Sequence, residues 1–133
     1  MSLNILLVED DEIEKLKFDR ALKKLDLQHN VMKASNGEEA LAKCKEVIPN
    51  LILLDLNMPK MNGLEFLSLL RADENLKFVP TVVFSTSNNH QDMINAYKIG
   101  IAGYVVKPLH YNDYVALIDK IINYWTVNEL VTL

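Results

Sequence analysis

Four short apolar runs in this chain each end abruptly in polar side chains. Residues 3–8 lead into Glu9 and Asp10, residues 51–54 into Asp55, residues 81–84 into Ser85, and residues 104–106 into Lys107. Runs of this length and composition are typical of strands buried on both faces of a parallel sheet. Ligands bind to such open sheets at the carboxyl ends of the strands. We therefore expect these polar side chains to line a single crevice.

Segments with helical periodicity separate the apolar runs. Residues 12–25 and 111–125 place apolar side chains at the i, i+3, i+4, i+7 spacing of a helix. Residues 29–34 alternate weakly and are expected to form an edge strand, whereas residues 51–54 form the most apolar run and are expected at the centre. Five β–α units result, and right-handed crossovers favour helices on both faces of a five-stranded parallel sheet.

Length and charge limit the classes of function open to the chain. Its 133 residues fit one domain, and a net charge of −4 without a basic stripe argues against a nucleic-acid partner. No apolar run approaches the ~20 residues of a membrane span, and no signal peptide precedes the first strand. We therefore expect a cytoplasmic protein without a membrane partner. The single cysteine, Cys44, lies in a helical pattern and is expected to pack rather than to react.

Acidic residues at two strand ends predict a metal site. The acids at positions 9–12 have one simple interpretation, which is favourable charge at a helix N-terminus. Asp55 favours a second interpretation, because a carboxylate directly after a buried strand is costly unless something compensates it. Mg²⁺ would offset the repulsion, since it takes one or two carboxylates and completes its shell with water and phosphate oxygens. Beside such an ion, Asp55 is a candidate nucleophile, because carboxylates form aspartyl phosphates.

Lys107 and Ser85 complete a set of groups suited to phosphate. Phosphoryl transfer depends on positioning and on charge stabilisation, and Lys107 offers a cation for it. Pro108 holds the preceding residue extended, which directs the ammonium group, while the cis or trans state of that bond stays open. The Ser85 hydroxyl could donate to a phosphoryl oxygen. The simpler alternatives are a solvated Lys107 and a turn-forming Ser85 in the polar loop 85–89.

Four motifs occur together in one order: residues 5–11 (ILLVEDD), residues 53–59 (LLDLNMP), a serine before a polar loop, and residues 103–108 (GYVVKP). In this combination the chain resembles the receiver domain of two-component response regulators over nearly its whole length. The resemblance implies a flavodoxin-like (βα)5 α/β fold, doubly wound, with strand order 2-1-3-4-5. It implies a receiver domain at residues 1–126 and a tail at residues 127–133, with no output domain.

The resemblance also implies the chemistry of the site. Asp55 would accept a phosphoryl group from the phosphohistidine of a sensor histidine kinase or a phosphotransfer protein. Mg²⁺, with Mn²⁺ as an alternative, would be held by Glu9, Asp10, Asp55 and the backbone carbonyl of Asn57. The domain would catalyse only its own phosphorylation and dephosphorylation, so it would not be an enzyme in the ordinary sense.

A conformational switch is implied at the other strand ends. Lys107 and Ser85 would bind the phosphoryl group, with Pro108 in a structural role. Ser85 and Tyr104 would turn inward after phosphorylation and remodel a protein-binding face. Ser85 stands where threonine is commoner in the family, and its rotamer is less restricted without the methyl group. Simple packing is the alternative role for Tyr104.

Other aromatic and histidine residues are expected to have structural or surface positions. Core or half-buried anchors are expected at Tyr97, Tyr111, Tyr114 and Trp125, and surface positions at His29, His90 and His110. The ending Tyr124-Trp125 and the loop 85–87 resemble small regulators associated with phytochrome-like kinases. The apolar tail is expected to pack on its own domain or on a second copy, which makes the protein a monomer or a weak homodimer. Its downstream protein target is not identified by the sequence.

Two other functions are compatible with some of these residues. A Mg²⁺-dependent phosphatase or phosphotransferase would also use Asp55 as a nucleophile. Such hydrolases commonly carry a second acid two residues later, where this chain has Asn57, and the chain has no room for a cap domain. A degenerate receiver would bind partners without phosphorylation, but the acids and Lys107 are all present.

Overall fold

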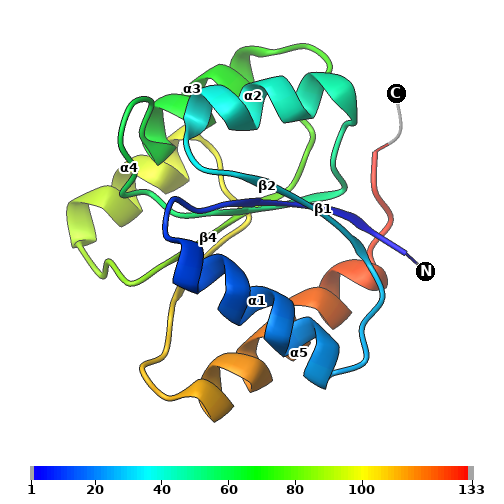
Figure 1. Ribbon diagram of the computed structural model, residues 1–133. Coiled ribbons are helices and arrows are strands. Elements are labelled where there is room, and N and C mark those ends of the chain that lie inside the picture. The colour runs from blue at the N-terminus through cyan, green and yellow to red at the C-terminus, as the bar shows by residue number, and fades with distance from the viewer. Residues whose placement is uncertain (1, 132–133) are drawn as a thin grey trace.

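Strands and helices alternate along residues 2–131, the part of the chain that the computed structural model describes (Figure 1). The strands are β1 (Asn4–Val8), β2 (Asn30–Ala34), β3 (Leu51–Leu54), β4 (Thr81–Ser85) and β5 (Gly103–Val106). The helices are α1 (Glu12–Lys24), α2 (Gly37–Glu46), α3 (Gly63–Ala72), α4 (His90–Ile99) and α5 (Tyr111–Thr126). All strand pairs are parallel, in the order β2-β1-β3-β4-β5. The order confirms the flavodoxin-like fold, with β3 at the centre and β2 at an edge.

The sheet lies between two helical layers (Figure 1). Helices α1 and α5 cover one face, and α2, α3 and α4 cover the other. Successive side chains of β1 alternate between the layers: Leu6 and Val8 pack towards α2 and α3, whereas Ile5 and Leu7 pack towards α1 and α5. The continuous apolar composition of β1 and β3 therefore reflects burial on both faces.

Polar side chains cap the N-termini of α1, α2, α3 and α4, the helices that follow β1 to β4. The Asp11 side chain accepts from the N–H groups of Ile13 and Glu14 and caps α1. Helix α3 begins with a capping box, in which Asn62 and Glu65 bond to each other's backbone N–H. Asn89 caps α4. These caps set where each strand-to-helix loop turns, and so they position the polar side chains in those loops.

The residues singled out in the sequence differ in how deeply they are buried. Cys44 is fully buried, as expected, and Tyr114 is a core residue on the buried face of α5. The expectation for Tyr97 is wrong, since its side chain is 50% exposed. It follows Ala96, the one buried residue of α4, so the helical rotation turns it towards solvent. His29 is half-buried rather than at the surface, and its Nδ1 accepts from the Leu3 N–H at 3.0 Å.

The tail lies at the amino ends of β3 and β4, where it lines a pocket with residues 48–50 and 78–80 (Figure 1). Leu130 packs against the apolar cluster shared by the sheet, α1 and α5. Val127 and Val131 are largely exposed. The tail thus packs on its own domain through Leu130, as one of the two expectations had it, and contact with a second copy stays a prediction. Within residues 2–131, no helix has the length and apolar character needed to cross a bilayer.

Candidate functional site

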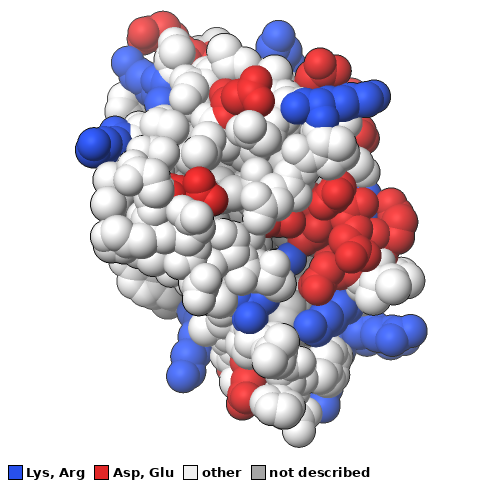
Figure 2. Space-filling view, turned by 90° about the vertical axis from the view of Figure 1, so that its left-hand side faces the viewer, with Lys and Arg blue, Asp and Glu red and all other residues white. Residues whose placement is uncertain are grey.

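The parallel sheet brings acids from two strands together at its carboxyl end. Glu9 and Asp10 follow β1, Asp55 follows β3, and one carboxylate oxygen from each of the three lies within 4.8 Å of the others. Glu9 is buried, Asp55 is half-buried and Asp10 is exposed. Figure 2 views the molecule from this end and shows acidic side chains gathered in one patch. Oxygen ligands at this spacing suit a hard divalent cation, which would offset their mutual repulsion.

Asp55 is held by groups from its own loop and from β4. Its Oδ1 accepts a hydrogen bond from Ser85 Oγ at 2.7 Å and a longer one from the Asn57 N–H at 3.4 Å. Its backbone N–H donates to Val8 O at 3.0 Å, which ties the end of β3 to the end of β1. The side chain is therefore fixed in direction and is still reachable from solvent.

Gly63 allows α3 to approach this loop closely. A Cβ atom at position 63 would lie 2.7 Å from the backbone oxygen of Asp55 and 2.7 Å from the Cα of Leu56. Real Cβ atoms do not come so close to backbone atoms, so a side chain here would force the loop to move. The glycine is thus a packing requirement of the site.

Lys107 is oriented towards the acids of β1 and α1. Its Nζ forms an ion pair with Glu9 Oε1 and lies 3.7 Å from Glu14 Oε2. Among residues 2–131 these are its carboxylate partners within salt-bridge distance, and Asp55 is not one of them. Burial raises the pKa of the Glu9 carboxyl, and the hydrogen bond and charge of Lys107 oppose that rise. The sequence correctly placed Lys107 at this edge but did not identify its partners.

Glu14 is a site residue that the sequence analysis missed. It lies in the first turn of α1, and its side chain is 23% exposed. One available signal was its spacing from Phe18, a fully buried residue four positions later, because residues i and i+4 share one face of a helix. A carboxylate on the inward face of α1 points towards the sheet rather than towards solvent.

A chain of hydrogen bonds connects Asp55 to β5. The Ser87 N–H donates to Ser85 Oγ at 3.2 Å, and the Tyr104 hydroxyl donates to the Ser87 carbonyl oxygen at 2.9 Å. Tyr104 is half-buried and also packs against the cluster beneath α4. The Ser85 hydroxyl therefore contacts Asp55, and the Tyr104 hydroxyl is anchored to the loop after β4, with packing also contributing to the position of Tyr104. Movement of the two side chains on phosphorylation stays a prediction.

Residues 5–119 match the family model of the response regulator receiver domain. The chain belongs to the response regulator receiver family. Among its relatives, the response regulator Rcp1 of Synechocystis is 34% identical over 136 aligned residues, which cover 97% of this chain and 91% of Rcp1. The chemotaxis protein CheY-3 of Vibrio cholerae is 31% identical, with 90% of this chain and 92% of that protein covered.

Solved structures agree with this assignment. The Mn²⁺-bound form of Rcp1 superposes with a TM-score of 0.88 at 31% identity, covering 98% of this chain and 99% of that chain. The phosphorylated cyanobacterial phytochrome response regulator RcpA gives a TM-score of 0.90 at 31% identity, covering 99% of this chain and 100% of that chain. This receiver domain therefore belongs to phosphorylation-dependent two-component signalling.

Receiver domains are signalling proteins rather than classical enzymes. They bind divalent metal ions, and they interact with histidine kinases or other phosphodonors and with downstream targets. In this receiver domain, Pro108 follows Lys107 through a trans peptide bond, as every peptide bond within residues 2–131 is trans. The backbone N–H of Lys107 donates to Ser85 O at 2.8 Å, which holds the ends of β4 and β5 together.

Proposed function

We propose that Asp55 is the phosphoryl acceptor of this receiver domain. The supporting observation is its setting: of the three clustered carboxylates, it is the one held by a neighbouring hydroxyl at the end of the central strand. One carboxylate oxygen would attack phosphorus as the bond from phosphorus to the donor's imidazole nitrogen breaks. The donor would be the phosphohistidine of a sensor histidine kinase or a phosphotransfer protein.

The metal in this proposal is Mg²⁺, with Mn²⁺ as an alternative. Glu9, Asp10, Asp55 and the backbone carbonyl of Asn57 would hold it, and the three clustered carboxylate oxygens fit such an ion. When bound, the ion offsets the negative charge of the acids and of the phosphoryl oxygens. Asp10 is the most exposed of the three acids, so it is the ligand best placed to admit the ion from solvent.

Ser85 and Lys107 would bind the phosphoryl group. Ser85 Oγ lies 2.7 Å from Asp55 Oδ1, so it can donate to an oxygen of a phosphoryl group carried there. Lys107 would turn part of its ammonium group from Glu9 towards the phosphoryl oxygens. In this role the domain catalyses only its own phosphorylation and the later hydrolysis of the aspartyl phosphate.

The change at Asp55 would be transmitted through Ser85 and Ser87 to Tyr104. These residues already form one hydrogen-bonded chain, so a shift of the Ser85 hydroxyl changes the anchor of the Tyr104 hydroxyl. The protein-binding face would be made by α4, β5 and α5. We propose a protein target rather than a nucleic acid or a membrane, for a cytoplasmic receiver domain at residues 1–126 that is monomeric or weakly dimeric.

The test is incubation with acetyl phosphate and Mg²⁺, followed by mass spectrometry of the intact protein. We expect one phosphoryl adduct on the wild type and none on Asp55→Asn or in the presence of a chelator. Asp113→Asn, an exposed acid in the first turn of α5, is the matched control and should keep the adduct. An adduct on Asp55→Asn would contradict the proposal, and turnover of many equivalents would indicate a phosphatase instead.

A further inference from the structure

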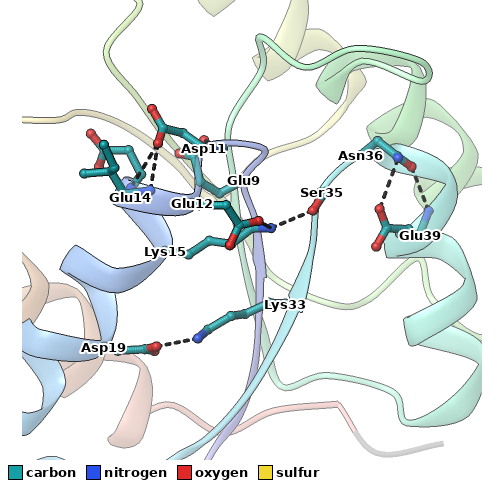
Figure 3. A network of polar contacts seen from close by, with 11 residues as sticks. Glu9, Asp11, Glu12, Glu14, Lys15, Asp19, Lys33, Ser35, Asn36 and Glu39 are labelled. Atoms are coloured by element: carbon teal, nitrogen blue, oxygen red, sulfur yellow. Dashed lines mark hydrogen bonds and ion pairs between the residues drawn. The ribbon is translucent and has the colours of Figure 1, made fainter.

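Two carboxylates, rather than one, hold Lys107 on the α1 side of the site. The Lys107 and Glu9 side chains are 5% and 4% exposed and form an ion pair. Glu14 Oε2 lies 3.7 Å from the same Nζ atom, and its side chain is 23% exposed. Glu9 follows β1 and Glu14 lies in the first turn of α1, as the close view in Figure 3 shows. Both negative charges therefore stabilise the ammonium group in its present position, in which Asp55 is not within salt-bridge distance of it.

The Glu14 carboxylate oxygen that lies nearest to Lys107 makes no hydrogen bond within residues 2–131. Glu14 Oε2 is buried and has no hydrogen-bond partner among the described residues. A buried carboxylate oxygen without a donor is costly, so the charge of Lys107 is its main compensation. The neighbouring acid Glu12 behaves differently: it is exposed and pairs with Lys15 at 3.0 Å. The position of Glu14 is therefore not explained by favourable charge at the helix N-terminus alone.

The geometry points to Glu14 as a positioning residue that restrains Lys107 and weakens its contact with a phosphoryl group on Asp55. This inference rests on the proposed role of Lys107 in binding that group. A lysine ammonium carries three N–H donors on a flexible stem and acts as a point charge. Asp55 is not among the carboxylates within salt-bridge distance of Lys107, so the ammonium group would have to leave or share its present contacts with Glu9 and Glu14 to donate to phosphoryl oxygens. The lost attraction opposes the phosphorylated state, so Glu14 acts as a restraint on activation.

The test uses beryllium fluoride, a phosphoryl mimic that binds to an aspartate carboxylate, at saturating Mg²⁺. Binding is followed by ¹⁹F NMR of the bound fluoride in the full chain. We expect Glu14→Gln to bind the mimic about two- to fivefold more tightly, the effect of losing a partly exposed charge pair. Glu12→Gln removes an acid from the same helical turn and is the matched control, with unchanged affinity expected. Glu14→Met provides a second neutral variant if the glutamine variant folds poorly.

A double-mutant cycle separates action through Lys107 from a general effect of charge or of structure. In a Lys107→Met background, Glu14→Gln should no longer change the affinity for the mimic, because the restrained ammonium is gone. An unchanged or weaker affinity in both neutral variants would overturn the inference, as would a full gain in the Lys107→Met background. Wild-type protein that binds no mimic would instead overturn the proposed function, so the two failures are distinguishable.

Discussion

The two ends of the sheet differ in how well their polar groups are satisfied. At the amino end, the Asn4 N–H donates to Asn50 Oδ1 at 2.7 Å, and the Asn50 N–H donates back to Asn4 O at 2.7 Å. His29 accepts from the Leu3 N–H there, and Leu130 of the tail packs against the neighbouring apolar cluster. This end therefore pairs its backbone groups and buries apolar area, both of which stabilise the fold.

The carboxyl end holds charges that oppose one another. Three carboxylate oxygens lie within 4.8 Å of one another, Glu9 is buried with a raised pKa, and Glu14 has a buried oxygen without a hydrogen bond. Only Lys107 brings a buried positive charge to this group among the described residues. The amino end therefore anchors the strands, while their other ends keep an unfavourable set of acids that a metal and a phosphoryl group can use.

The largest expected effect comes from crowding the carboxyl end. Gly63→Ala would place a Cβ atom 2.7 Å from backbone atoms of the loop after Asp55, and we expect a loss of about 1–3 kcal/mol in the free energy of unfolding. Mg²⁺ affinity should fall as well, because the loop carries metal ligands in the proposed site. Urea denaturation and Mg²⁺ titration measure the two effects.

Gly103→Ala is the matched control, since a Cβ there would come no closer than 3.9 Å to its nearest neighbour, Val82 Cγ1. Both properties should stay nearly unchanged in that variant. Equal losses in the two variants would show that the carboxyl end is not uniquely crowded at Gly63.

The second effect is a pH dependence at the C-terminal end of α2, where Cys44 is buried. Burial, and then the charge of Asp73, raises the pKa of the Cys44 thiol to about 12 from an ordinary 9.0. Above pH 9 the unfolded chain loses this proton while the folded protein keeps it, so stability is lost as pH rises towards 12. We expect about 1 kcal/mol less stability from this group at pH 10 than at pH 8.

Urea denaturation of the wild type and of Cys44→Ala at both pH values isolates this contribution. The alanine variant is less stable at either pH because of its cavity, but its loss between pH 8 and pH 10 should be smaller by that amount. Parallel losses in the two proteins would show that the thiol ionises normally in the folded state.

A smaller effect is expected from the tail. Leu130→Ala removes half-buried apolar area at the amino end, and we expect a cost of about 1 kcal/mol in the free energy of unfolding. Val131→Ala, at a position that is 61% exposed, should cost almost nothing. Mg²⁺ affinity should be the same in both variants and the wild type. A change in metal affinity for Leu130→Ala would mean that the two ends are coupled.

The smallest effect on the metal-free protein is expected at Asp10. Asp10→Asn removes one of three mutually repelling acids, so the free energy of unfolding should rise. We expect a rise of only about 0.5 kcal/mol, because the side chain is exposed and its interactions are screened. The same variant should lose most of the stabilisation that Mg²⁺ gives to the wild type, which thermal denaturation with and without the ion measures. Undiminished stabilisation by Mg²⁺ would remove Asp10 from the metal site.

Much of the fold and of the site could be predicted from local patterns. The apolar runs placed β1 to within one residue and β3 at its observed bounds, because burial on both faces leaves no room for polar residues. Parallel strands end at a common edge, which is why Glu9, Asp55 and Lys107 were expected together. The exposure of Tyr97 was not predicted, since α4 buries only Ala96 and its apolar pattern is weak.

By itself, the sequence determined which residues form strands and helices and which chemical groups stand at the strand ends, because those properties depend on neighbours along the chain. Tertiary structure alone decided which of these groups pair. Lys107 and Glu9 are 98 residues apart in sequence, and the inward face of α1 adds Glu14 to the pair. Likewise, Tyr104 bonds to the Ser87 carbonyl from a neighbouring strand. Such contacts depend on how separate elements are placed in space, to within the length of a hydrogen bond, and no local pattern specifies that placement.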